Sequence, residues 1–454
     1  MSEPKDPAPS SPLPSEEGTQ AVAVESKEPE NDRPPLPELV SINELHARPA
    51  AELLQLAVEL NLRLNGRGKH QLIHQLASFY VRNDVRVEAE GLLDLQKENF
   101  GYLRYPEFSL KPLPDDIYVH TSLVREFGLR YGSRLKVVLR KPRNRDKFIP
   151  AETVLEIEGS AVEGHAPSRP FEKLTALFPD QRLILENRAV PTIAPRLVDL
   201  VAPLGMGQRG LIAAPPRGGK TILLKEIARS LHENYPEVEL IVLLLDERPE
   251  EVTDFQEAVD AQVFSSTFDE SPKRHIQLAE LVSERAKRLV EQKKDVVLLL
   301  DSLTRLARGF NALQGGKGGT MSGGIHRKAL EKPRRFFGSA RNVEEGGSLT
   351  ILATALIETE SKMDQVIFEE FKGTGNMELH LDREFAEQRM FPAIHLPKSG
   401  TRNDDRLYHP DEFQRITLLR KQLAQLPPIE ALEKISHKIA NTTSNAEILM
   451  GGTR

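Results

Sequence analysis

The chain has 454 residues, with 61 lysines and arginines against 67 aspartates and glutamates, and its formal net charge is -6. It contains no cysteine, which excludes disulfides, thiolate catalysis and cysteine-ligated metal centres, and no apolar run approaches the roughly 18–20 residues that a membrane-spanning helix needs. The length is enough for about two to four domains, and the composition, together with a first segment unlike a secretory signal, predicts a soluble cytoplasmic protein with no membrane contact.

The first segment, residues 1–38, holds nine of the 32 prolines and no aromatic residue. Such a composition buries too little apolar surface to fold, so a disordered tail is predicted. Residues 39–87 follow, with two amphipathic stretches at helical spacing, 50–60 and 69–81, separated by the breaker sequence NGRG. They predict a small helical module that serves either packing or nucleic-acid contact.

Residues 88–158 contain short strand-like runs punctuated by glycine, proline and asparagine, which predict a small β-barrel. The runs are residues 91–95, 100–104, 116–120, 134–140 and 154–158. On the second run, Phe100, Tyr102 and Arg104 share one face because side chains alternate along a strand. These three side chains predict a stacking platform for single-stranded bases, which Tyr118 can join.

A basic stretch lies near this platform in the sequence and is suited to binding phosphates: Arg134, Lys136, Arg140, Lys141, Arg143, Arg145 and Lys147. The alternative for Phe100 and Tyr102 is packing in the barrel core, and the basic stretch favours binding over packing. The net negative charge does not exclude nucleic acid, because a local basic patch is sufficient.

After a connection at residues 159–170, residues 171–454 alternate apolar strand runs with helical patterns. This alternation predicts an α/β fold with a parallel sheet and helices on both faces. An apolar run at 210–213 is followed by the sequence APPRGGKT (214–221) and a helical stretch at 222–231. Strand, glycine-rich loop and helix in this order predict a phosphate-binding loop.

The phosphate-binding loop assigns a role to each of its polar groups. Backbone N–H groups from Arg217 onward, with Gly218 and Gly219, line the phosphates, since Pro215 and Pro216 have no N–H. Lys220 reaches the β- and γ-phosphates of ATP, and the Thr221 hydroxyl coordinates Mg²⁺. The alternative is a glycine-rich turn with an incidental Lys-Thr pair.

Two nearly continuous apolar strands end in acidic residues, at 239–245 before Asp246 and Glu247 and at 296–300 before Asp301. The carboxyl ends of parallel strands meet at one sheet edge, so we expect both acids beside the phosphate loop. Asp301 is predicted to hold the magnesium ion, and Glu247 to orient and deprotonate the attacking water. The alternative is that acids end buried strands only because the chain must reach solvent there.

A glycine-rich segment at 314–324, QGGKGGTMSGG, carries a single cation, Lys317. It is either a mobile surface loop or a loop that grips a polymer backbone and moves with the nucleotide state. The sequence statistics do not choose between these two.

Several long motifs together resemble the bacterial transcription termination factor Rho family. They are FGYLR (100–104), PDDIYV (114–119), APPRGGKT (214–221), DERPEEV (246–252), LDSLTRLAR (300–308), RNVEEGGS (341–348) and FKGTGNMELH (371–380). The resemblance covers about residues 39–450. It implies a homohexameric ring of RecA-like ATPase domains that moves along single-stranded RNA and releases transcripts from RNA polymerase. RNA polymerase and elongation factors are then its protein partners.

The resemblance also implies roles for individual residues. In the nucleotide pocket, Phe391 stacks on adenine, Arg248 and Arg305 line the site, and Arg389 and Arg402 reach the γ-phosphate held by the neighbouring subunit. The catalytic set is then Glu247, Lys220, Arg248, Arg402 and Arg389, and the nucleotide-binding set is Pro216, Arg217, Gly218, Gly219, Lys220, Thr221, Ile222, Arg248 and Phe391.

RNA contacts are implied at two places, a primary site on a cold-shock-like barrel and a second site in the pore of the ring. The barrel residues are Phe100, Tyr102, Arg104, Tyr118, Lys147 and Phe148, and the pore residues are Lys317, Ser322, Gly323 and Lys362. Lys317 lies slightly earlier in its loop than the family pattern places it, and the proline-rich tail is outside the pattern.

Two other functions are compatible with parts of the sequence. A catalytic subunit of a rotary ATP synthase shares the ATPase core and an N-terminal barrel, but needs neither an aromatic, basic barrel face nor a glycine-rich lysine loop. An RNA-binding regulator with a decayed ATP site is the other alternative. Intact Lys220, Thr221, Glu247 and Asp301 argue against that decay.

Overall fold

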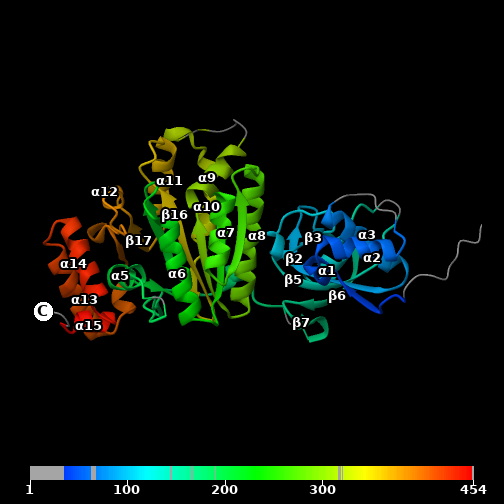
Figure 1. The fold of residues 1–454 in the computed structure, drawn as a ribbon, viewed down its shortest axis with the longest axis horizontal. Coiled ribbons are helices and arrows are strands. Elements are labelled where there is room, and N and C mark those ends of the chain that lie inside the picture. Colours follow the sequence, from blue (N-terminus) through cyan, green and yellow to red (C-terminus); the bar gives the residue numbers. More distant parts are fainter. Residues whose placement is uncertain are drawn as a thin grey trace, which may run out of the picture.

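The computed structural model describes residues 35–62, 68–143, 146–164, 167–189, 191–314, 319 and 321–451. The described chain is elongated, with a helical module and barrel at one end, an α/β domain in the middle and a group of C-terminal helices at the other end (Figure 1). Nearly all of the predicted proline-rich tail lies outside the described residues. No helix of the described ranges is long and apolar enough to cross a bilayer.

The N-terminal helices are α1 (Ile42–Ala47), α2 (Ala50–Glu59) and α3 (Lys69–Arg82). Their apolar faces do not form a separate core. Leu53 and Ile73 of the helices belong to the same buried cluster as Val87, Leu93 and other residues of the barrel. The helices and the barrel therefore fold around one shared core.

The barrel is a closed sheet of five strands. They are β2 (Arg86–Leu95), β3 (Gly101–Arg104), β4 (Ile117–Val119), β5 (Arg134–Leu139) and β6 (Ile149–Ile157). The order β2-β3-β4-β6-β5 closes because β5 also pairs with β2, and only β4 and β6 run parallel. Two short strands extend this sheet, β1 (Leu39–Ser41) beside β2 and β7 (Ser160–Ala161) beside β6, and α4 (Thr121–Glu126) follows β4.

Two barrel strands are longer than the sequence predicts, since β2 begins at Arg86 and β6 at Ile149. The first half of β2 is rich in charged residues and therefore does not read as a strand. Its glutamates are neutralised across the sheet, where Glu88 pairs with Lys136 at 3.2 Å and Glu90 with Arg134. Pairing between strands thus supplies what the local sequence lacks.

The α/β domain is built on a nine-stranded sheet with the order β13-β12-β14-β16-β11-β17-β18 and a side branch of β15 and β8. The strands are β8 (Ala176–Leu177), β11 (Arg209–Ala214), β12 (Glu239–Glu247), β13 (Gln262–Thr267), β14 (Asp295–Asp301), β15 (Arg341–Val343), β16 (Ser348–Leu356), β17 (Met377–His380) and β18 (Gly400–Thr401). The six strands from β13 to β17 on the main path are parallel. A separate pair is formed by β9 (Arg182–Leu183) and β10 (Leu204–Gly205).

Helices cover both faces of this sheet, as the strand pattern predicts. They are α5 (Ile193–Val201), α6 (Lys220–Asn234), α7 (Pro249–Ala258), α8 (Pro272–Glu291), α9 (Leu303–Ala312), α10 (Glu331–Phe337) and α11 (Lys362–Lys372). Alternate residues of β12 face opposite ways: Leu244 joins the core with α6 and α7, and Leu243 joins the core with α8 and α9. The predicted fold class, a RecA-like α/β domain preceded by helices and a barrel, is confirmed.

Helix α8 forms much of the contact between the barrel and the α/β domain, where it lies beside the barrel in Figure 1. Arg274 near its start donates to the backbone oxygens of Ser109 and Leu110, and Arg285 pairs with Glu158 at 2.5 Å. Gly132 has a φ of +81°, and a Cβ there would lie 2.7 Å from the backbone of α8 at Arg285. The barrel is therefore seated closely on this helix.

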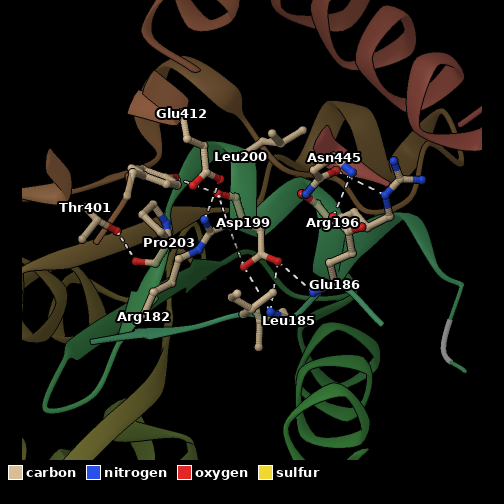
Figure 2. Close-up of polar contacts among 12 residues, drawn as sticks. Arg182, Leu185, Glu186, Arg196, Asp199, Leu200, Pro203, Thr401, Glu412 and Asn445 are labelled. Atoms are coloured by element: carbon tan, nitrogen blue, oxygen red, sulfur yellow. Dashed lines mark hydrogen bonds and ion pairs between the residues drawn. The ribbon is translucent and has the colours of Figure 1, made fainter. Parts of the chain in front are cut away.

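The C-terminal helices are α12 (Arg383–Glu387), α13 (Pro410–Leu423), α14 (Pro428–Ala440) and α15 (Asn445–Leu449). Figure 2 shows how α5 holds the last of them. The buried guanidinium of Arg196 donates to the backbone oxygens of Ile439 and Thr442, both at 2.7 Å, and to Asn445 Oδ1 at 3.2 Å. This one side chain therefore joins the end of α14 to the start of α15.

Asp199 on the same helix organises the segment that leads into α5. Its buried carboxylate accepts hydrogen bonds from the backbone N–H groups of Leu185 at 3.0 Å and Glu186 at 2.7 Å, and lies 3.5 Å from Arg182 (Figure 2). Burial raises the pKa of Asp199 to about 6, although Arg182 and the two N–H donors act in the opposite direction.

Candidate nucleotide site and nucleic-acid interface

The predicted phosphate loop forms a tight turn between β11 and α6. Gly218 N–H donates to Pro215 O at 3.0 Å, and both Arg217 and Gly219 have positive φ, at +62° and +88°. Helix α6 begins at Lys220, so the free N–H groups of its first turn and its positive dipole end face the loop. Pro216 and Arg217 are exposed, and Thr221 is half-buried at the start of the helix. The turn has the form of an anion-binding site.

The two acid-ended strands meet beside this loop. Lys220 Nζ lies 2.8 Å from Glu247 Oε1 and 2.6 Å from Asp301 Oδ2, so its ammonium group bridges the two carboxylates. Asp301 is 1% exposed, and its other oxygen accepts from the Thr354 hydroxyl at 2.7 Å. The three side chains come from a helix and two strands that are far apart in the sequence, and parallel packing brings them together.

Burial and charge act differently on the members of this triad. Burial raises the pKa of Glu247 to about 7 and the negative charge of Asp301 adds to this effect, whereas Lys220 opposes it. Burial alone lowers the pKa of Lys220, but Asp301 and Glu247 outweigh it and the pKa of the lysine is raised. Glu247 therefore titrates close to neutral pH while Lys220 stays charged.

The donor set fits Mg²⁺. Thr221, Glu247 and Asp301 offer one hydroxyl and two carboxylates, all hard oxygen ligands, and the charge of Lys220 between the carboxylates shows that the position accommodates a cation. No softer ligand contributes to this set.

An apolar cavity of about 280 Å³ adjoins the phosphate loop. Phe391 lies over the loop, because a Cβ on Gly219 would be 3.3 Å from its ring, and Phe391 and Ile222 are 46% and 56% exposed. Residues 191–194 also line the cavity, and the sequence analysis missed them because nothing in their local pattern marks a site. The cavity has the chemistry of a pocket for a planar base.

The four arginines predicted to act on the nucleotide are at the surface or close to it. Arg305 pairs with Asp246 at 2.8 Å, next to Glu247, and Arg248 is the exposed residue that precedes α7. Arg389 and Arg402 are exposed on the segments that flank Phe391 and β18.

Four aromatic rings gather on one face of the barrel. Tyr102 lies at their centre, with ring centroids 5.8 Å from Phe100, 5.9 Å from Tyr118 and 5.0 Å from Phe148. All four side chains are half-buried, and none belongs to the shared core of the module and barrel. Phe100 and Tyr102 therefore do not pack in the barrel core, which was the alternative for them. Phe148 joins them because β4 and β6 pair in parallel beside β3.

Arg104 lies differently from the expected stacking face. It is 7% exposed and forms ion pairs with Asp94, at 2.8 Å, and with Asp116, while its guanidinium carbon lies 5.1 Å from the centre of the Tyr102 ring. Strand alternation predicts the face of Arg104 but not its depth, and an RNA contact by its guanidinium stays a prediction. Arg104 therefore lies within cation–π distance of the Tyr102 ring while its charge is held by Asp94 and Asp116.

The basic stretch is only partly free to meet phosphates. Arg134 and Lys136 pair with the glutamates of β2, whereas Lys147 is exposed, with its ammonium 5.5 Å from the centre of the Phe148 ring. Arg145 lies outside the described residues. Lys147 therefore lies directly beside the aromatic cluster.

The two predicted pore segments contact one another. Gly323, in the short turn Ser322–Gly324, has a φ of +79°, and a Cβ there would lie 2.8 Å from Lys362 O. The Lys362 side chain is exposed at the start of α11, and the buried Asp364 two residues later is held by Arg308 of α9 at 2.6 Å. Ser322, Gly323 and Lys362 therefore form one surface. Lys317 lies outside the described residues.

Comparison with known proteins identifies the family. A model of the Rho termination factor RNA-binding domain matches residues 89–163, and a model of the ATP synthase alpha/beta family nucleotide-binding domain matches residues 195–401. A transcription termination factor Rho of Akkermansia muciniphila is 55% identical over 426 residues, which are 94% of this chain and 90% of the relative. The chain belongs to the Rho family. A second Rho, from Pseudomonas fluorescens biotype C, is 48% identical over 91% of this chain and 100% of its own length.

Solved structures agree on the fold. An ATPase from the type III secretion system of pathogenic bacteria matches with a TM-score of 0.52 at 23% identity, over 62% of this chain and 87% of that chain. The same ATPase fold therefore occurs in a secretion ATPase and in this Rho-family chain. Because both an RNA-binding and a nucleotide-binding domain are matched in one chain, the comparisons agree with transcription termination and not with the rotary or regulator alternatives.

Proposed function

We propose that this Rho-family chain is a motor that uses ATP hydrolysis to move along nascent single-stranded RNA and releases the transcript from RNA polymerase. The proposal includes a cytoplasmic homohexameric ring with elongation factors as further partners. Its strongest support is that one chain combines a half-exposed aromatic cluster on a barrel with a complete phosphate loop, basic residue and acid pair.

Residues 88–158 capture RNA in this proposal, residues 39–87 support them, and residues 171–454 hydrolyse ATP. Bases stack on Phe100, Tyr102, Tyr118 and Phe148, which need no particular base because every base has an aromatic face. The Lys147 ammonium is positioned for the phosphates between them. This site holds the RNA while the ring encloses it.

In the nucleotide site, Phe391 and Ile222 hold the adenine, and the N–H groups of the phosphate loop bind the phosphates. When ATP enters, the Lys220 ammonium moves from the carboxylates to the phosphates, which leaves Glu247 free to orient a water molecule and take its proton. Thr221 and Asp301 would hold a magnesium ion, which would supply positive charge to the phosphates. Exposed Arg389 and Arg402 of one subunit complete the site of the next, so that hydrolysis requires the ring.

Hydrolysis is linked to RNA movement through α9. This helix begins two residues after Asp301, and its Arg308 holds Asp364 beside Lys362 of the pore surface. A change in position at the nucleotide therefore displaces the residue that contacts RNA. The coupling runs through one helix and one partly buried ion pair.

The deciding experiment is the steady-state ATPase rate of the full chain with and without cytosine-rich single-stranded RNA at a fixed salt concentration. We expect stimulation of at least tenfold, which Lys362→Ala removes. Lys372→Ala, an exposed lysine at the other end of α11, is the matched control and keeps the stimulation. ATP hydrolysis at the same rate with and without RNA would favour the rotary-type alternative. No ATP hydrolysis in either condition would favour the RNA-binding regulator.

A further inference from the structure

A cluster of histidine and aspartate side chains lies where the helical module meets the barrel, away from both sites described above. His46 is on α1, His70 is in the first turn of α3, and Asp115 precedes β4 of the barrel. One ligand atom from each lies within 4.8 Å of those of the other two. His46 Nε2 contacts Asp115 Oδ2 directly, and His70 Nδ1 is 3.1 Å from Asp115 Oδ1.

Two polar side chains of this cluster, Asp115 and His46, are almost fully buried, which is unusual for titratable groups. The side chain of Asp115 is 0% exposed and that of His46 is 2% exposed, and both of the ion-pair partners that the described residues give Asp115 are histidines. A buried carboxylate without a fixed cation is unfavourable, because it has lost its water. It needs a positive charge that the described arginines and lysines do not bring.

Two buried polar atoms in the cluster also make no hydrogen bond within the described chain: His46 Nδ1, and Asp115 Oδ1, whose one charged neighbour there is His70 Nδ1 at 3.1 Å. Native proteins rarely leave such atoms unpaired, so each one needs an explanation. Both are accounted for if an ion lies between the three side chains, because Asp115 Oδ1 is then a ligand. His46 Nδ1 then carries the proton and points toward the Glu107 carboxylate, 4.0 Å away.

We propose that His46, His70 and Asp115 bind a Zn²⁺ ion that fastens the helical module to the barrel. Two imidazoles and one carboxylate are a common zinc ligand set. Tetrahedral ligand atoms at about 2.0–2.2 Å from zinc lie roughly 3.3 Å from one another. The three ligand atoms of this cluster lie within 4.8 Å of one another, so they can reach that spacing. His70 is 24% exposed, so water completes the coordination from that side. The rings of Tyr105 and Phe108 pack edge-on against His46 at 4.3 and 5.0 Å and keep the other side dry.

The position of the ion gives it a consequence for RNA binding. The residue after Asp115 is Asp116, the partner of Arg104. Tyr118 of the aromatic cluster lies three residues after Asp115. Zinc fixes this segment against α1 and α3, so the protein with bound metal holds the aromatic cluster more rigidly. The site is independent of the nucleotide pocket and of the proposed motor activity.

The test is a metal titration of the full chain after chelator treatment, without nucleotide. We expect one Zn²⁺ per chain in the cluster and a rise in melting temperature on binding, and we expect Co²⁺ to give the strong visible absorption of a tetrahedral site. His70→Ala, at a half-exposed position, weakens binding at least tenfold, and Asp115→Asn abolishes the cobalt absorption. His437→Ala, an exposed histidine on α14, is the matched control and changes neither.

Absence of zinc binding to the wild-type chain would overturn the proposal, and the cluster would then be a histidine–aspartate hydrogen-bond network. Equal binding by the wild type, His70→Ala and Asp115→Asn would also overturn it, because the metal would lie elsewhere. Because a variant can fail to fold, the cobalt spectrum of the wild type is the primary readout, and a strong tetrahedral spectrum supports the proposal. A weak octahedral spectrum contradicts the proposed ligand set.

Discussion

Replacing Tyr102 with alanine removes the centre of the aromatic cluster. Its ring lies within 6 Å, centre to centre, of three other rings, and the Arg104 guanidinium carbon lies 5.1 Å from its centre. A base stacked on such a ring contributes about 1–3 kcal/mol. Because the three neighbouring rings also lose a packing partner, we expect a loss near the upper end, about 2–3 kcal/mol. This corresponds to a roughly 30- to 150-fold weaker affinity for single-stranded RNA.

The assay is a fluorescence anisotropy titration of the full chain with a labelled cytosine-rich RNA at constant salt and without nucleotide. Tyr102→Phe keeps the ring and is expected to bind within about twofold of the wild type. Phe178→Ala, an exposed aromatic of the α/β domain at 61% exposure, is the matched control and is expected to bind normally.

A change of less than threefold for Tyr102→Ala, in a protein with an unchanged melting temperature, would refute the stacking role. The ring would then be a packing element of the barrel surface. An equal loss in Phe178→Ala would show that the assay does not report on the barrel.

Three further predictions concern the α/β domain. Lys220→Ala is expected to abolish ATP hydrolysis and leave RNA binding to the barrel intact; a matching loss of RNA affinity in a folded variant would contradict two separate sites. Glu247 has a pKa raised to about 7 and must be ionised to take the proton of the attacking water. The kcat/KM of ATP hydrolysis should therefore fall as the pH drops below about 7. A flat profile from pH 5.5 to 8.5 would exclude this role. Arg196→Met removes the side-chain donor of the buried Thr442 carbonyl and leaves the Ile439 carbonyl only its longer contacts, from the Thr442 N–H at 3.3 Å and the Thr442 hydroxyl at 3.4 Å. It should destabilise folding by about 2–3 kcal/mol in denaturant titration, and a loss below about 1 kcal/mol would mean that other contacts hold the C-terminal helices.

The linear motifs of the nucleotide site could be predicted because each is local. A phosphate loop needs a strand, a turn and a helix that are consecutive in the chain, and residues 210–231 provide all three. The acid-ended strands were also predictable, because a nearly unbroken apolar run marks a strand covered on both faces. Their meeting beside Lys220 followed from the rule that parallel strands end at one edge.

The barrel was less predictable from the sequence. The first half of β2 carries glutamates whose cross-strand partners lie on β5, more than 40 residues away, so local hydrophobicity could not mark it as a strand. The same limit applied to Arg104. Its neighbours along the chain placed it on the aromatic face, but its burial depends on Asp94 and Asp116 from two other segments.

The sequence by itself determined the order of the parts, the fold class and the family, because these depend on patterns within short stretches of chain and on long, specific motifs. Tertiary structure decided which side chains meet. It gathered four aromatics from three strand regions, joined Gly323 to Lys362, and brought His46, His70 and Asp115 to one buried point. The reason is that burial and charge compensation depend on all the neighbours of a side chain in space, and most of those neighbours are far away in the sequence.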